Sequence, residues 1–274
     1  MISIILPTYN NEKTIFDSIN SILNQNYCNF ELIIINDFST DKTKQIIKTF
    51  NDNRIIYLEN KKNIGSTKSI LRGIDKAKGD YIARMDGDDI SLPERLEIQL
   101  NYLILNPNID LVASNIILFT SNKVIGNSKL ELFNSNNINF YMRTLGLPHM
   151  TWMTKAEFFK NFKYNTYFKV AQDQDLLLRA NNFCKFALLK DPLLFVRIPE
   201  KKNVKYKLKQ IYNLLLARIS YLNNMKLFYY YPLILISFIR SAFYYIFSSK
   251  SIDYEINTNL NSKYQDILDK VTKN

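Results

Sequence analysis

The 274-residue sequence predicts an α/β domain with a mostly parallel sheet flanked by helices, followed by a helical C-terminal tail. Two observations predict the domain. Short β-branched runs alternate with segments of helical periodicity over the first 120 residues, and polar residues follow the ends of these runs. A third observation predicts the tail, because residues 201–252 contain nine Lys and Arg but no Asp or Glu. We therefore expect a body over residues 1–200 and a tail over residues 201–274.

The body begins with two strand–helix pairs. Ile2–Leu6 is a β-branched run that a proline follows, which predicts a buried strand ending in a loop. Apolar residues at helical spacing predict a helix within Asn11–Asn24, and the unbroken apolar run in Glu31–Asn36 predicts a second buried strand. Ser39–Asp41 are cap-forming residues, so we expect another helix directly after them.

The same alternation continues to about residue 120. Ser66–Lys76 has helical periodicity, and a helix with Pro93 in its first turn and leucines at helical spacing is expected to follow. Further apolar runs of strand length occur at Arg54–Leu58, Tyr81–Met85 and Asp110–Phe119. Residues 120–170 lack such regularity and are predicted only as loops with short elements.

The composition narrows the function classes. The formal net charge of +11 taken alone suggests nucleic acid, an anionic membrane or a phosphate-bearing substrate. Residues 1–200, however, carry 24 Lys and Arg against 21 Asp and Glu, so most of the excess lies in the tail. Two cysteines exclude a disulfide framework and a cysteine-rich zinc module.

Polar clusters follow three of the predicted strands. They are Pro7–Asn11 after the first strand, Asn36–Asp37 after the second and Asp86–Asp89 after the fourth. In an open α/β sheet, ligands bind outside the carboxyl ends of the strands, so we expect the three clusters to line one crevice.

The Asp86–Asp89 cluster contains three carboxylates within four residues. Such carboxylates repel one another unless a cation lies among them, and oxygen ligands suit Mg²⁺ or Mn²⁺. The sequence contains neither a GxGxxG nor a Walker phosphate loop. A phosphate ligand would therefore be held through the metal and through scattered cationic side chains.

Several segments together resemble the family-2 glycosyltransferases, whose fold is the Rossmann-like GT-A fold. The segments are ISIILPTYNN at 2–11, IINDFSTD at 34–41, Asn63–Gly65 and GDYIARMDGDDISLP at 79–93. PHMTWM at 148–153, AQDQDLLLRA at 171–180 and Leu193–Arg197 also fit, so the resemblance extends over roughly residues 1–197.

The resemblance implies a metal-dependent, inverting transfer of a sugar from a nucleotide-sugar, usually a UDP-sugar, to an acceptor hydroxyl. It implies that Asp173 is the catalytic base, that Asp88 binds the metal and that Asp86 contacts the ribose. It implies that the remaining donor-binding residues are Pro7, Thr8, Tyr9, Asn10, Asp37, Gly65, Arg84 and Arg179. The acceptor would be a glycan or a polyprenyl-diphosphate-linked glycan in surface-polysaccharide synthesis.

Each of these roles has a structural alternative. Asp173 is also suited to cap the helix that follows it, and Arg179 to pair with a local carboxylate. His149 and Trp152 are candidates for the sugar site, although single buried residues of these types are common in cores. Asp89 is suited either to cap a helix or to support the metal through another residue.

The tail predicts contact with a membrane surface. Lys205–Lys226 has an apolar face at helical spacing and is basic elsewhere. Leu227–Phe247 is long enough to cross a bilayer, but Pro232, Arg240 and several tyrosines favour a position in the interface. We expect a monotopic enzyme on the inner, cytoplasmic face of the plasma membrane rather than a single C-terminal span, with packing of the basic face on the body as the alternative.

Two other functions remain open at this point. A nucleotidyltransferase that makes nucleotide-sugars uses a related sheet, but the expected Gly-rich basic loop after the first strand is absent. A nucleic-acid-binding protein would account for the positive charge, yet the basic residues cluster beside Tyr, Phe and Leu instead of spreading over a groove-facing surface. We therefore expect no nucleic-acid partner, and the oligomeric state is left open.

Overall fold

The computed structural model describes residues 1–121, 123–130, 132, 147–168, 170–198, 204–224, 226, 228–247, 254–255 and 258–272. The expected alternation of strands and helices is present in the first half. Its elements are β1 (Ile2–Thr8), α1 (Ile15–Leu23), β2 (Phe30–Asn36), α2 (Thr43–Ile47), β3 (Ile55–Glu59), α3 (Ser66–Ile74) and β4 (Tyr81–Arg84).

The second half is less regular in sequence and contains several elements that the periodicity does not indicate. Its first elements are β5 (Ile90–Ser91), α4 (Arg95–Leu105), β6 (Leu111–Thr120), β7 (Lys123–Ser128), η1 (His149–Thr151), β8 (Met153–Lys155) and α6 (Ala156–Asn161). They are followed by α7 (Gln172–Ala180), β9 (Phe186–Arg197), α8 (Val204–Asn224), η2 (Phe228–Tyr230), α9 (Tyr231–Phe247), β10 (Tyr254–Glu255) and α10 (Thr258–Thr272).

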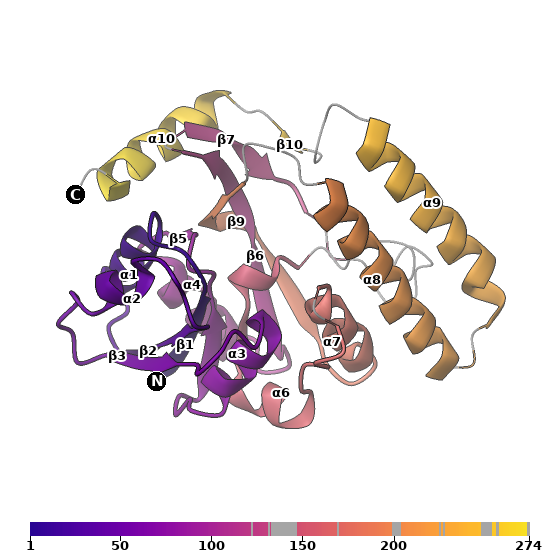
Figure 1. The fold of residues 1–274 in the computed structure, drawn as a ribbon, viewed down its shortest axis with the longest axis horizontal. Coiled ribbons are helices and arrows are strands. Elements are labelled where there is room, and N and C mark those ends of the chain that lie inside the picture. Colours follow the sequence, from indigo (N-terminus) through magenta and orange to yellow (C-terminus); the bar gives the residue numbers. More distant parts are fainter. Residues whose placement is uncertain are drawn as a thin grey trace.

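The strands form one curved sheet in the order β10-β7-β6-β8-β4-β1-β2-β3 (Figure 1). β1 pairs in parallel with β2 and β4, and β2 pairs in parallel with β3. From β8 onward the sheet is mixed, because β8 is antiparallel to both β4 and β6. The α/β fold is confirmed, and its parallel part is the region that carries the predicted polar clusters.

Two core layers cover opposite faces of this sheet. Alternate residues of β1 point to opposite faces, so Ile4 packs in the layer with Ile19 of α1 and Leu96 of α4. Ile5 packs in the other layer with Ile70 of α3 and with α7. Burial on both faces is the reason why the strands read as unbroken apolar runs.

The first strand is longer than its proline suggests. β1 continues through Pro7 to Thr8, and Thr8 pairs with Asn36 of β2. The pairing between β1 and β4 ends at Ile5 and Arg84. Proline is therefore tolerated here, because the missing N–H falls beyond the paired part of β4.

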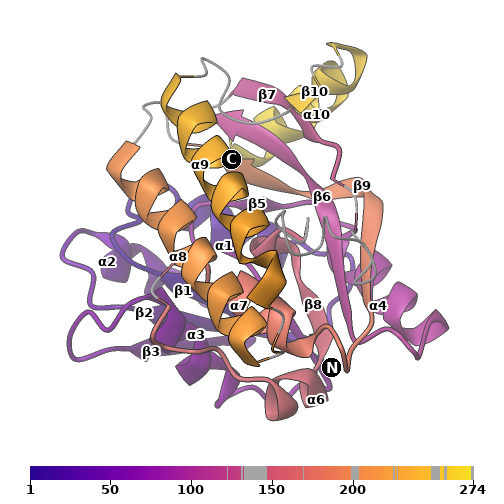
Figure 2. The ribbon, with the colours of Figure 1, turned by 90° about the vertical axis from the view of Figure 1, so that its right-hand side faces the viewer.

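The beginning of the tail packs against the body. Tyr221 and Leu222 of α8 are buried in the core layer that contains Leu177 of α7, and Asn182 Nδ2 donates to the Tyr221 hydroxyl at 3.3 Å. α9 lies outside α8 at one side of the molecule (Figures 1 and 2). No helix in the described part of the chain is both long and apolar enough to cross a membrane. The predicted boundary at residue 200 lies outside the described residues.

Candidate active site

The ends of β1 and β4 meet at a glycine. A Cβ atom on Gly87 would lie 2.9 Å from Thr8 Oγ1, closer than real Cβ contacts allow. The Gly87 carbonyl accepts a hydrogen bond from Thr14 Oγ1 at 3.1 Å, and Thr8 Oγ1 donates to Asn11 Oδ1 at 2.9 Å. Gly87 thus lets the Asp86–Asp89 loop contact the end of β1, as the sequence predicts.

The loops after β1 and β2 are joined through Asn10. Its backbone N–H donates to Ser39 Oγ at 3.0 Å, and its side-chain carbonyl accepts from the Thr40 N–H at 2.8 Å. Asn10 has a φ of 54° and Phe38 a φ of 64°, a left-handed conformation that non-glycine residues seldom adopt. Tyr9, which lies between Thr8 and Asn10, is exposed.

Asp37 is buried at the end of β2, and the following chain holds its carboxylate. Oδ1 accepts from Asn60 Nδ2 at 2.7 Å and from the Ile64 N–H at 2.8 Å, and Oδ2 accepts from the Gly65 N–H at 2.8 Å. Gly65 has a φ of 87°, a backbone conformation that a residue with a side chain would adopt only under strain. Asp37 and Gly65, which the resemblance names separately as donor-binding residues, are therefore in direct contact.

Arg84, the last residue of β4, holds Asp86. Its guanidinium donates to both carboxylate oxygens, at 2.6 Å and 3.1 Å. Burial lowers the pKa of Arg84, but Asp86, together with Tyr164 and Asp89, keeps that pKa above its ordinary value. Asp86 is thereby fixed at the crevice by a permanent positive charge.

The side chains of Asp86, Asp88 and Asp89 fit a hard divalent cation. Each offers one oxygen, and these oxygens all lie within 4.8 Å of one another. Asp89 is buried, and although its Oδ1 accepts from the Arg197 N–H at 3.1 Å, its Oδ2 has no hydrogen-bond partner among the described residues. Burial and the nearby Asp86 raise the pKa of Asp88 to about 6. A bound Mg²⁺ or Mn²⁺ would give the unpaired Asp89 oxygen a partner and would remove the repulsion between the three carboxylates.

Asp173 lies in the first turn of α7. Ala171, which precedes the helix, has a φ of 65°, a left-handed conformation that costs an alanine about 1 kcal/mol. The N-cap position of α7 is occupied by Ala171, so Asp173 is not the N-cap residue, although backbone N–H groups of the first turn act on its carboxylate. Asp173 Oδ2 accepts from Gln174 Nε2 at 3.3 Å, and burial raises the pKa of Asp173. A carboxylate with a raised pKa suits general-base chemistry.

Arg179 has a local partner. Its guanidinium donates to Asp175 Oδ2 at 3.0 Å and 2.8 Å, and Nη2 also donates to the Lys163 carbonyl at 2.8 Å. Asp175 is one turn earlier on the same helix and is buried. The geometry thus agrees with the local-carboxylate alternative for Arg179.

His149 and Trp152 belong to the interior. The two rings pack edge to face at 4.6 Å between centroids, and Trp152 Nε1 donates to the Leu147 carbonyl at 3.2 Å. His149 Nε2 lies 2.6 Å from the Tyr164 hydroxyl, and burial lowers the pKa of His149 well below its ordinary value. Trp152 is therefore a core residue and cannot serve as a stacking platform for sugars in this conformation.

Tyr206 of α8, which the sequence does not indicate, is an exposed residue that senses the charges of the site. Burial raises the pKa of Tyr206, and the carboxylates of Asp86 and Asp173 raise it further. The hydroxyl therefore lies within electrostatic reach of both carboxylates, so the first turn of α8 borders the site. Only the placement of α8 against α7 reveals this, since one tyrosine among many carries no signal in the sequence.

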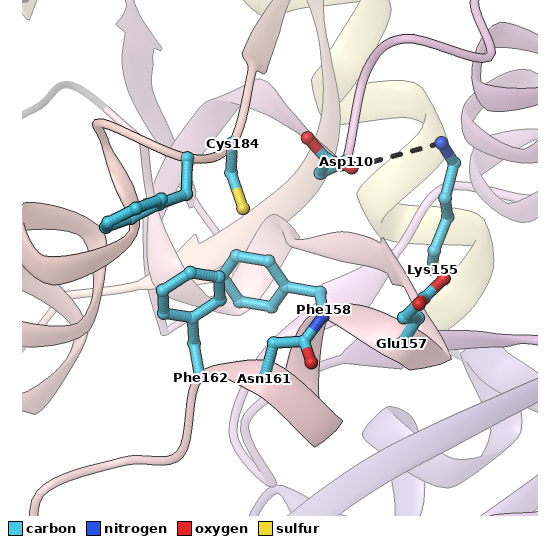
Figure 3. A pocket seen from close by; sticks show the side chains of 8 residues that line it. Asp110, Lys155, Glu157, Phe158, Asn161, Phe162 and Cys184 are labelled. Carbon is cyan, nitrogen blue, oxygen red and sulfur yellow. Dashed lines mark ion pairs between the residues drawn. The ribbon is translucent and has the colours of Figure 1, made fainter.

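A second pocket is separate from this site. Its cavity of about 440 Å³ is lined by Asp110, Lys155, Glu157, Phe158, Asn161, Phe162, Phe183 and Cys184 (Figure 3). Lys155 pairs with Tyr81, the first residue of β4, whereas the carboxylates follow the last residue of that strand. The pocket therefore opens at the opposite edge of the sheet and takes no part in the arrangement described above.

Known proteins are similar to this chain in sequence and in fold. The sequence model described as Glycosyl transferase family 2 matches residues 3–172. An uncharacterized glycosyltransferase of Methanocaldococcus jannaschii is 35% identical over 218 residues, which cover 77% of this chain and 75% of the relative.

Two further proteins are informative about ligands. The UDP-Glc:alpha-D-GlcNAc-diphosphoundecaprenol beta-1,3-glucosyltransferase of Escherichia coli is 36% identical over 126 residues, which are 46% of this chain and 49% of that protein. The chain thus matches only about half the length of that relative. The mannosyltransferase from Pyrobaculum calidifontis, solved in complex with GDP-Man and Mn²⁺, superposes with a TM-score of 0.63 at 15% identity and covers 90% of this chain and 70% of its own. The mannosyltransferase therefore shares the fold of this chain.

The family model and the Methanocaldococcus jannaschii relative together show the family. The chain belongs to glycosyl transferase family 2 and is a glycosyltransferase.

Proposed function

We propose that the protein is a metal-dependent, inverting glycosyltransferase that moves a sugar from a UDP-sugar to a hydroxyl of a glycan or lipid-linked acceptor. The observation that carries this proposal is the unpaired oxygen of Asp89 beside Asp86 and Asp88, at the sheet edge where Asp37 also lies. The Escherichia coli relative takes its name from a UDP-Glc donor, and the Pyrobaculum calidifontis structure contains Mn²⁺. Neither the nucleotidyltransferase nor the nucleic-acid alternative has support in these comparisons.

The hydrogen bonds around Asp37 and Asp86 support the proposed donor-binding roles. Asp37, held by the Ile64 and Gly65 N–H groups, can accept the imide N–H of uracil, with Pro7, Thr8, Tyr9 and Asn10 forming the adjacent wall. Asp86 contacts the ribose and is oriented by Arg84. Asp88 would hold the metal ion, which would supply positive charge against the leaving diphosphate. Since Arg179 is engaged by Asp175, we assign it to the support of α7.

The transfer step uses Asp173. The acceptor hydroxyl gives its proton to the Asp173 carboxylate while its oxygen forms a bond to the anomeric carbon. The bond between that carbon and the diphosphate oxygen breaks, and the electron pair leaves with the nucleoside diphosphate. Attack from the face opposite the leaving group inverts the anomeric centre.

We further propose that the enzyme works at the cytoplasmic face of the plasma membrane. The support is the tail, in which residues 201–252 are basic and aromatic and lack acidic residues. An acceptor linked to a polyprenyl diphosphate would be presented at that surface. The name of the Escherichia coli relative contains an acceptor of this class.

A thermal-shift panel tests this function. UDP-sugars, GDP-sugars and free nucleotides are each added with and without Mn²⁺. A ligand at a hundred times its dissociation constant stabilises a protein by about 2.7 kcal/mol, so bound donors are readily distinguished. We expect stabilisation by UDP-sugars only when Mn²⁺ is present. Indifference to every donor would contradict the proposal, and metal-dependent stabilisation by GDP-sugars alone would refute the choice of uracil.

A further inference from the structure

One face of α9 is apolar and exposed. Leu235, Ile236, Ile239 and Phe243 are between 52% and 63% exposed. In a helix, where successive residues are 100° apart, these four positions fall within a stripe about 100° wide. We call this stripe the α9 apolar face.

The opposite side of the same helix is held by the body. Ile234 is buried in the core layer of α3 and α7, and Tyr230 and Tyr231 pack against that layer. Tyr231 also donates a hydrogen bond to Asn223, next to the end of α8. The α9 apolar face is therefore presented outward in a fixed orientation, and α9 is the nearest element to the viewer in Figure 2.

All charged residues that the structure describes in α8, in α9 and in the turn between them are basic. Arg240 is exposed on α9, and Lys205, Lys209 and Lys226 are exposed on or beside α8. Residues 201–252 contain no acidic residue that could pair with them. Two copies of the chain meeting through this face would bring like charges together, which disfavours a dimer here.

We propose that the α9 apolar face inserts into the interface of an anionic lipid bilayer, with the basic residues of α8 and α9 on the headgroups. Apolar insertion combined with contacts between Lys or Arg and acidic headgroups is how interfacial helices bind membranes. This inference rests on the membrane placement proposed above and names the surface responsible. The position of this face also determines which side of the enzyme is turned toward the bilayer, because α8 leads from the site near Tyr206 to α9.

The test is co-sedimentation of the full chain with vesicles of phosphatidylglycerol and phosphatidylcholine. Ile236→Ser/Ile239→Ser removes the centre of the face without touching the core. Its matched control is Ile104→Ser/Leu105→Ser, which changes two exposed apolar residues at the end of α4. We expect the α9 variant to bind vesicles at least tenfold more weakly than the wild type, since two partly exposed aliphatic side chains no longer enter the lipid. The control variant should bind as the wild type does.

Two additional measurements make the result decisive. Pure phosphatidylcholine vesicles, or raised salt, should weaken binding of the wild type, because the headgroup contacts are electrostatic. The inference is overturned if the α9 variant binds as tightly as the wild type, if both double variants lose binding equally, or if the α9 variant changes only the oligomeric state. Donor binding measured without vesicles reports separately on the proposed function, so the two failures are distinguishable.

Discussion

Arg84 donates to both carboxylate oxygens of Asp86, 2.6 Å from Nη2 and 3.1 Å from Nη1. A lysine cannot reproduce this two-point contact. We expect Arg84→Lys to weaken nucleotide-sugar binding by roughly tenfold, because Asp86 loses its fixed orientation.

Titration calorimetry with a UDP-sugar and Mn²⁺ measures this effect. Arg54→Lys is the matched control, since Arg54 makes the same two-point contact with Asp52 at 3.0 Å and 2.8 Å, away from the crevice. Equal losses in both variants would show that the Arg84 contact has no special role in donor binding.

The contact between Gly87 and Thr8 predicts a steric effect. Gly87→Ala places a methyl group 2.9 Å from Thr8 Oγ1, so the loop or the strand must shift. We expect a loss of about 1–3 kcal/mol in the free energy of unfolding. Denaturant titration of Gly87→Ala, Thr8→Ala and the double variant forms a cycle, in which the double variant should recover part of the loss. Strict additivity would contradict the contact.

The partly buried Asp173 predicts a pH dependence. Its pKa is raised by burial, and the base must be ionised to accept a proton. Transfer measured at saturating donor and Mn²⁺, so that donor binding does not limit it, should therefore fall as the pH drops through a value above the ordinary aspartate range. An acidic limb at the pKa of an ordinary aspartate would contradict the assignment.

Asp173→Asn separates catalysis from folding. Because the folded pKa of Asp173 lies above the unfolded value, its ionised form is penalised in the folded state, and the carboxylate lowers stability at neutral pH. The variant should lose transfer by roughly 10²-fold or more while its melting temperature at neutral pH does not fall. Surviving transfer would place the base elsewhere.

Tyr206 predicts a role in acceptor binding. It lies in the first turn of α8, and the carboxylates of Asp86 and Asp173 both act electrostatically on its hydroxyl. We expect Tyr206→Ala to raise the KM for the acceptor by roughly three- to tenfold with little change in donor affinity. Tyr212→Ala is the control, because Tyr212 is on the same helix and similarly exposed, at 53% against 55%. A similar change in both variants would exclude a specific role for Tyr206.

The elements that sequence reasoning located are those whose signal is local. Ile33 and Ile34 face opposite core layers, so β2 reads as an unbroken apolar run, and Asp37 follows it directly. The carboxyl ends of parallel strands necessarily share one edge, which is why the contact between Gly87 and Thr8 could be anticipated.

The elements that it missed depend on distant partners. β9 is a strand because it pairs with β6, although Lys190, Asp191 and Pro192 interrupt its apolar pattern. The position of Tyr206 follows from how α8 packs on α7, and the local pairing of Arg179 could only be left as one of two possibilities. Such relationships arise from tertiary packing and leave no periodic signature.

The Asp88→Asn variant tests whether the carboxylates after β4 hold the metal on which nucleotide binding depends. Titration of UDP into the wild type should require Mn²⁺, and Asp88→Asn should remove that requirement together with most of the affinity, because the carboxylate bridging protein and metal is gone. Asp52→Asn, outside the crevice, should bind as the wild type does. If Asp88→Asn binds UDP with unchanged affinity and unchanged dependence on Mn²⁺, the carboxylates after β4 do not hold the metal, and the account is wrong.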